Sequence, residues 1–163
     1  MRNAISSLCD QLLQSAPPRA LSTLKRTILF DTNIVLDRWV FNDPSVVFFD
    51  ELLNTGAWQS IGHRETLKEL VDVISRAQFN LSTEKQSAII KNWIEETVIV
   101  NGDLPTRRYC KDQDDDKFFA LATLASPCLL LSKDKKVLKV KTKAAKLGIT
   151  VLSIDEFRKK YGH

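Results

Sequence analysis

Short runs of consecutive apolar residues alternate along the chain with longer segments in which apolar residues recur every three or four positions. The short runs predict strands that are largely buried, at residues 28–30, 58–61, 98–100, 128–131 and 150–154. The longer segments predict amphipathic helices that begin near residues 43, 64, 83, 112 and 155, with a lysine-rich helical region over residues 133–146. Strands that alternate with helices are typical of an α/β domain with a mostly parallel central sheet.

Several polar residues stand where helices are expected to begin or end. Asp43 followed by Pro44 predicts an N-cap and a first-turn proline. Thr83 and Gln86 have the spacing of a capping box, which predicts Thr83 as the N-cap of the next helix. Near the N-terminus, apolar residues at helical spacing stop before Pro17, so residues 1–27 are expected to form a helical extension that packs outside a domain of residues 28–163.

The composition describes an ordinary globular domain. The chain has 163 residues, of which 44% are hydrophobic and 27% charged, and its longest apolar runs are far too short to span a bilayer. Asp10 interrupts the only apolar stretch that could resemble a secretion signal. Cys9, Cys110 and Cys128 are odd in number and far apart, which predicts reduced thiols and a cytoplasmic protein without membrane contact.

The residue counts exclude several kinds of catalysis. His63 and His163 are the only histidines, which excludes a histidine-rich zinc site and leaves no nucleophile motif near a histidine. With five glycines in all, the chain has no glycine-rich phosphate-binding loop. If the protein is an enzyme, carboxylates must carry out its chemistry.

Acidic residues follow two predicted strands and open one predicted helix. Asp31 comes directly after one strand, Asp134 follows another, and residues 112–116 contain four aspartates. Because the carboxyl ends of parallel strands lie at one edge of a sheet, these groups are expected in one crevice. Two carboxylates 4 Å apart repel by about 4 kcal/mol at an effective dielectric constant near 20, which a bound cation relieves. Oxygen ligands of this kind suit Mg²⁺ or Mn²⁺ and phosphoryl hydrolysis, although residues 112–116 alone would be an ordinary helix start.

Three segments resemble the motifs of PIN domains. Residues 28–36, where an apolar strand runs into Asp-Thr-Asn, resemble the opening of that family. Residues 110–122 resemble its third motif, and Leu130-Leu131-Ser132-Lys133-Asp134 resembles its fourth, with Lys133 in place of the usual glycine. The resemblance covers about residues 27–157 and is closest to bacterial toxin components of toxin–antitoxin pairs. It implies a three-layer α/β/α sandwich with a mostly parallel sheet of about five strands.

The resemblance also implies a set of site residues. It makes four acidic residues catalytic: Asp31, Glu69, Asp115 and Asp134. Of these, Asp31, Asp115 and Asp134 would bind Mg²⁺ or Mn²⁺. Groups that would orient the ligands or the metal-bound water are Thr32, Asn33, Ser132, Asp112 and Asp116. From the residues alone the second acid stays open, because Glu65, Glu69 and Asp72 share one side of a predicted helix. The position of the third acid also stays open by about one residue, because Asp112 and Asp116 lie close to Asp115 in sequence.

The function expected from this resemblance is metal-dependent endoribonuclease activity on single-stranded RNA. The partners would be RNA, a cognate antitoxin and a second copy of the chain in a homodimer. An acidic crevice would repel RNA, so Lys133, Lys135 and Lys136 beside Asp134 are expected to contact the RNA backbone. The net charge of +4 is compatible with that partner. The alternative is a non-catalytic RNA- or partner-binding module with a structural metal site.

Two other classes that begin with an aspartate after a buried strand fit the sequence less well. A haloacid-dehalogenase-type phosphatase needs a second aspartate where this chain has Asn33. A two-component receiver needs an acidic pair after its first strand, which is absent.

Overall fold

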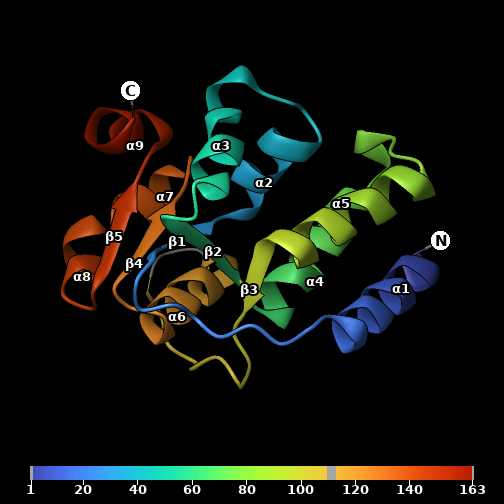
Figure 1. Cartoon of the computed structure of the whole chain (residues 1–163), viewed down its shortest axis with the longest axis horizontal. Helices are drawn as coiled ribbons and strands as arrows, with labels where there is room; N and C mark the ends of the chain where they lie inside the picture. The colour runs from blue at the N-terminus through green and yellow to red at the C-terminus, as the bar shows by residue number, and fades with distance from the viewer. Residues whose placement is uncertain (1, 110–112, 163) are drawn as a thin grey trace.

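The computed structural model describes residues 2–109 and 113–162 (Figure 1). The strands are β1 Arg26–Phe30, β2 Trp58–Gly62, β3 Thr97–Ile99, β4 Cys128–Leu131 and β5 Ile149–Leu152. The helices are α1 Arg2–Ser15, α2 Thr32–Trp39, α3 Phe48–Asn54, α4 Arg64–Ile74, α5 Thr83–Glu96, α6 Asp116–Leu124, α7 Lys135–Leu138, α8 Lys141–Ala145 and α9 Ile154–Tyr161. Short 3₁₀ helices lie at η1 Pro44–Val46, η2 Ala77–Phe79 and η3 Gln113–Asp115.

The five strands form one parallel sheet in the order β3-β2-β1-β4-β5. From β1 the chain runs outward through β2 and β3, then crosses back to β4 and β5 on the other side of β1. In such a sheet a crevice opens at the carboxyl ends of the two strands between which the direction reverses, here β1 and β4. Ile28 pairs with Leu129 and Phe30 with Leu131, so these two strands end level with each other. The predicted α/β class is therefore confirmed.

Alternating residues of the strands serve two separate cores. Ile28 and Phe30 belong to a core covered by α1, α2, α3, α4, α5 and α9. Leu29 belongs to a second core covered by α6, α7 and α8. Helices therefore flank both faces of the sheet, as Figure 1 shows, and the predicted three-layer α/β/α sandwich is confirmed. The alternation also explains why the strand sequences are apolar at nearly every position.

The helix starts agree with the sequence at one position and differ at another. Asp43 caps η1, and its carboxylate accepts a hydrogen bond from the Ser45 amide at 2.9 Å, as predicted. The prediction of Thr83 as N-cap of α5 is wrong. Ser82 is the cap, with its hydroxyl accepting from the Lys85 amide at 3.1 Å, and Thr83 is the first helical residue. Ser82 has the extended backbone (φ −65°, ψ 161°) that this position requires.

The N-terminal helix α1 is part of the larger core. It packs against α5 and α4, and Ile5 and Cys9 are buried there. The helix ends before Pro17, as the sequence predicts. The division of the chain at residue 27 stays a prediction. Within the described residues, no helix is both long enough and apolar enough to cross a membrane.

Arg38 on α2 links this helix to α3 and α5, next to Phe30 of β1. Its side chain is only 3% exposed, and its guanidinium donates to Asp50 at 2.7 Å and to both carboxylate oxygens of Glu96 at 2.5 and 2.7 Å. The guanidinium carbon also lies 5.0 Å from the centre of the Phe30 ring and 4.8 Å from that of Trp39. Because a two-pronged guanidinium fits a carboxylate closely, this contact fixes α2 against α5.

Replacing Arg38 with methionine should lower stability strongly. The substitution leaves the mostly buried Glu96 carboxylate without its cation, which costs about 3 kcal/mol of unfolding free energy. The melting temperature should fall by about 10 °C, measured by calorimetry. Arg76→Met is the control, because Arg76 forms an exposed pair with Asp72 at 3.5 Å. An Arg38→Met loss no larger than that of the control would contradict the prediction.

Candidate active site

Asp31 lies at the carboxyl end of β1, beside the end of β4. It follows β1 directly and caps α2, with Oδ1 accepting from the Ile34 amide at 3.2 Å. Its Oδ2 accepts a hydrogen bond from the Ser132 hydroxyl. Ser132 follows β4, and the level ends of the two strands bring these residues together. Asp31 is 5% exposed and Ser132 is fully buried, so the carboxylate is held by fixed donors away from water.

Asp134 lies beside this pair. Its amide donates to the Ser132 oxygen at 3.0 Å, and its carboxylate caps α7 by accepting from the Lys136 amide at 2.8 Å. Burial raises the pKa of Asp31 to about 6, and the charge of Asp134 adds to that increase, whereas the hydrogen bond from Ser132 opposes it. The structure thus places these two predicted residues together at the edge of the sheet.

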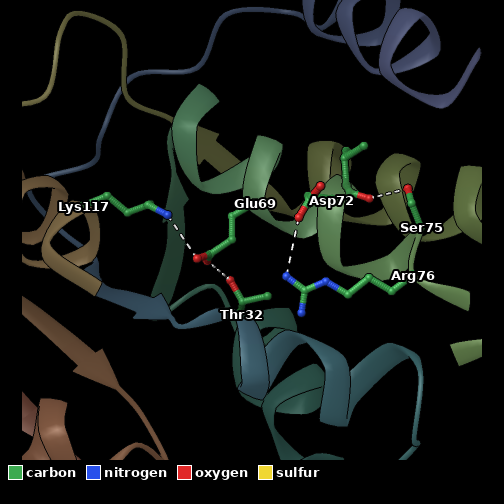
Figure 2. A network of polar contacts seen from close by, with 7 residues as sticks. Thr32, Glu69, Asp72, Ser75, Arg76 and Lys117 are labelled. Carbon is green, nitrogen blue, oxygen red and sulfur yellow. Dashed lines mark hydrogen bonds and ion pairs between the residues drawn. The ribbon is translucent and has the colours of Figure 1, made fainter. Parts of the chain in front are cut away.

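Glu69 reaches the same edge from α4. Its Oε2 accepts from the Thr32 hydroxyl, and its Oε1 lies 3.0 Å from the ammonium nitrogen of Lys117 (Figure 2). Thr32 is the residue directly after Asp31. Its hydrogen bond to Glu69 therefore ties the Glu69 carboxylate to the start of α2, next to Asp31. Both oxygens of the Glu69 carboxylate are therefore engaged by side chains of this chain.

The other acidic residues on this side of α4 pair with basic residues that are near them in sequence. Glu65 lies 3.8 Å from Lys68, and Asp72 lies 3.5 Å from Arg76. In Figure 2 the Asp72 side chain extends along α4 toward Arg76 rather than toward Thr32. Of the three acids that the sequence left open, Glu69 is the one that the structure brings to the end of β1.

Sequence reasoning missed Lys117. A lysine that follows four aspartates at a predicted helix start is typical of an ordinary helix residue. Phe118 and Leu121 are buried in the second core and fix α6 against the sheet. With α6 fixed in this way, the neighbouring Lys117 reaches α4. A signal was available, because Glu69 needs a cation if it is placed at a crowded acidic edge.

The acidic segment before α6 serves several purposes. Asp115 ends η3 at the start of α6, and its Oδ2 is buried. Asp116 accepts from the Tyr109 amide at 2.8 Å and lies 3.6 Å from Arg108, so it anchors the preceding loop. Asp112 lies outside the described residues. Asn33 is exposed, and its backbone amide donates to Asp31, which favours the ionised carboxylate.

Lys133 and the next lysines differ in their surroundings. The Lys133 ammonium lies 2.7 Å from an oxygen of Asp37, whose side chain on α2 is 6% exposed. Lys135 and Lys136 are exposed on α7, next to Asp134. The residue that replaces the glycine of the PIN motif thus neutralises a buried carboxylate, while the next two lysines face solvent.

The donor atoms at this edge are chemically suited to a hard divalent cation. Asp31 and Asp134 offer carboxylate oxygens, and a cation would offset the burial and repulsion that raise the pKa of Asp31. Among the described residues, however, no three Asp, Glu, His or Cys side chains are grouped closely enough to hold a metal ion. Both oxygens of Glu69 contact Lys117 and Thr32. Glu69 therefore does not join the other acids in the four-residue cluster that the sequence predicts.

The fold and the acidic edge together define a parallel α/β domain with carboxylates at the carboxyl ends of β1 and β4. Residues 27–136 match the family model described as PIN domain, and the chain belongs to this family. PIN domains are generally nucleases and typically use divalent metals. None of the curated proteins compared with the chain matches it.

Replacing Asp31 with asparagine should stabilise the metal-free protein at neutral pH. Because the folded pKa of about 6 lies above the ordinary value of 3.8, ionising Asp31 opposes folding. The cost is absent below about pH 4, grows from there to about pH 6 and is full above it. Denaturant unfolding in EDTA should show Asp31→Asn more stable by up to about 3 kcal/mol above pH 7.

This gain should shrink as the pH falls through 6 and disappear near pH 4. Asp72→Asn is the control, since Asp72 lies on the exposed side of α4. A gain for Asp31→Asn that is independent of pH would show that ionisation is not its cause.

Replacing Lys133 with alanine should destabilise the protein. The buried Asp37 carboxylate would lose a charged hydrogen bond, at a cost of about 2 kcal/mol. The double variant Lys133→Ala/Asp37→Asn should recover most of this loss, because it also removes the buried charge. Lys135→Ala, at an exposed position, should change little. Equal melting temperatures for the two single lysine variants would contradict this account of Lys133.

Proposed function

We propose that the protein is an Mg²⁺- or Mn²⁺-dependent endoribonuclease that hydrolyses single-stranded RNA. The observation that carries the proposal is the pairing of Asp31 with Ser132 and Asp134 at the level ends of β1 and β4 in a PIN domain. A buried carboxylate whose pKa is raised by burial and by a neighbouring aspartate favours the binding of a divalent cation.

The residues take different parts in this proposal. Asp31 and Asp134 would hold the cation, and Asp115, which the structure does not group with both of them, would have to approach to complete the set. When bound, the cation supplies charge neutralisation and a more acidic water. Ser132 orients Asp31 through its hydroxyl. In the hydrolysis, a water oxygen forms a bond to phosphorus and one phosphorus–ester bond breaks. The leaving oxygen takes up a proton, so that one RNA end carries the phosphate and the other a hydroxyl.

Lysines next to the edge support RNA as the substrate. Lys135 and Lys136 are exposed on α7, directly after Asp134, where they can contact the phosphate backbone without reading sequence. Lys133 would join them only if it left Asp37. The net charge of +4 favours a polyanionic partner over a polycationic one.

We extend the proposal to the biological setting. The order of the motifs resembles bacterial PIN toxins, which supports a toxin neutralised by an antitoxin protein and acting as a homodimer. The described cysteines, Cys9 and Cys128, are both free and buried, which fits a reducing cytoplasm. The alternative of a non-catalytic binding module draws support from the engaged state of Glu69. Cleavage assays separate the two.

The decisive experiment is cleavage of single-stranded RNA by the purified chain. Cleavage should require Mg²⁺ or Mn²⁺ and stop in EDTA. Either cation should raise the melting temperature of the wild-type protein, because a ligand that binds the folded state stabilises it. Asp31→Asn should abolish both effects while the protein stays folded. Undiminished cleavage in EDTA, or none under any metal, would overturn the proposal.

Two glutamate variants on α4 test the assignment of Glu69. Glu69→Gln should lower the cleavage rate by about a hundredfold, because its contacts with Lys117 and Thr32 weaken. Glu65→Gln is matched in helix and chemistry and should stay near the wild-type rate, since Glu65 lies toward Lys68. Similar rates for the two variants would show that Glu69 has no special part in the reaction.

A further inference from the structure

Lys117 brings a positive charge to the acidic edge beside Glu69. Its ammonium nitrogen lies 3.0 Å from Glu69 Oε1, and Thr32 holds the other oxygen of the same carboxylate (Figure 2). The Lys117 and Glu69 side chains are 24% and 22% exposed, so the pair is largely withdrawn from water and still reachable from solvent.

The position of this ammonium group is fixed from two sides. Phe118 and Leu121 anchor α6 in the second core, which prevents the helix from moving away. On the other side, Thr32 ties Glu69 to the residue directly after Asp31. The Glu69 carboxylate therefore links the Lys117 ammonium group to Thr32, the first residue of α2. This holds the charge of Lys117 at the site proposed for the reaction.

A purely structural role explains this arrangement poorly. A largely buried ion pair contributes little more to stability than apolar residues of similar size. An ammonium group also has three donors, and Glu69 takes one of them at Oε1. The remaining capacity suits the non-bridging oxygens of a phosphodiester, which gain negative charge as water attacks.

We propose that Lys117 is a catalytic residue whose ammonium group contacts a non-bridging oxygen of the scissile phosphate, and that Glu69 positions it instead of binding the metal. This inference rests on the proposed nuclease function and deepens it. The lysine neutralises charge on the phosphate, and Glu69 and Thr32 keep it in place. Loss of one such preorganised donor lowers a catalytic rate by about a hundredfold.

A charge-neutral phosphate analogue tests the contact directly. The cleavage position in a short single-stranded RNA is mapped first, and a methylphosphonate is then placed at that linkage. Binding of both RNAs is measured in EDTA, where no cleavage occurs. Wild-type protein should bind the analogue about tenfold more weakly, corresponding to about 1.4 kcal/mol. Lys117→Met should bind the two RNAs equally.

Further variants separate this contact from general effects. Lys68→Met removes a lysine on α4 that is 61% exposed and should keep the wild-type difference between the two RNAs. Lys117→Arg retains the charge and should recover part of the cleavage rate that Lys117→Met loses. Lys117→Met/Glu69→Gln leaves no unpaired charge. If Lys117→Met does not fold, this double variant takes its place and should show the same loss of discrimination.

The metal serves as an independent readout. The affinity for Mn²⁺ without RNA, measured by electron paramagnetic resonance, should be unchanged in Lys117→Met and in Glu69→Gln. A tenfold or greater tightening in Lys117→Met would show that the lysine competes with the metal for Glu69 and would overturn the assignment.

Two results would distinguish failure of this inference from failure of the proposed function. Cleavage by the wild-type protein together with the same methylphosphonate penalty in wild type and Lys117→Met would overturn the role of Lys117 alone. A wild-type protein that cleaves no RNA in Mg²⁺ or Mn²⁺ would overturn the nuclease proposal, and the role of Lys117 with it.

Discussion

The in-register pairing of β1 with β4 is the constraint on which the candidate site depends. It ends both strands at the same level, so that Asp31 meets Ser132 although 101 residues separate them in sequence. The same hydroxyl accepts from the Asp134 amide and fixes the second acid relative to the first. A slip of one residue would turn the apolar residues of β4 toward the wrong cores and separate the acids. The same register of β1 and β4 is therefore needed both for the packing of the sheet and for the geometry of the site.

Buried charge is handled in two different ways in this molecule. Three carboxylates have a cation of the chain beside them: Glu96 binds Arg38, Glu69 binds Lys117 and Asp37 binds Lys133. Asp31 is more deeply buried than Glu69, yet the contacts shown for it in the described part of the chain are with amide and hydroxyl donors. Neutral donors stabilise a carboxylate less than a full positive charge does. This difference distinguishes Asp31 electrostatically from the acids that the fold itself neutralises.

Much of the fold and the centre of the site could be predicted from the sequence. Apolar runs identified the strands, because a strand between two helical layers has no polar face. Asp31 and Asp134 followed from the rule that parallel strands end at one edge, and Ser132 followed from the resemblance to PIN domains. The cap at Ser82 was missed because Thr83 next to it satisfies the same pattern. Lys117 and Lys133 were harder to interpret, since their partners lie 48 and 96 residues away and only the packing of helices joins them.

The contacts of Asp31 restrict how long the side chain at this position can be. One carboxylate oxygen reaches the Ile34 amide in the first turn of α2, and the other reaches across the sheet to Ser132. Both contacts suit a single methylene between backbone and carboxylate. A glutamate would carry the same charge one bond farther out, where it fits neither donor and caps a helix poorly. At this position the fold therefore tolerates the loss of the charge better than a longer side chain, and natural variation here should be confined to side chains of the same length.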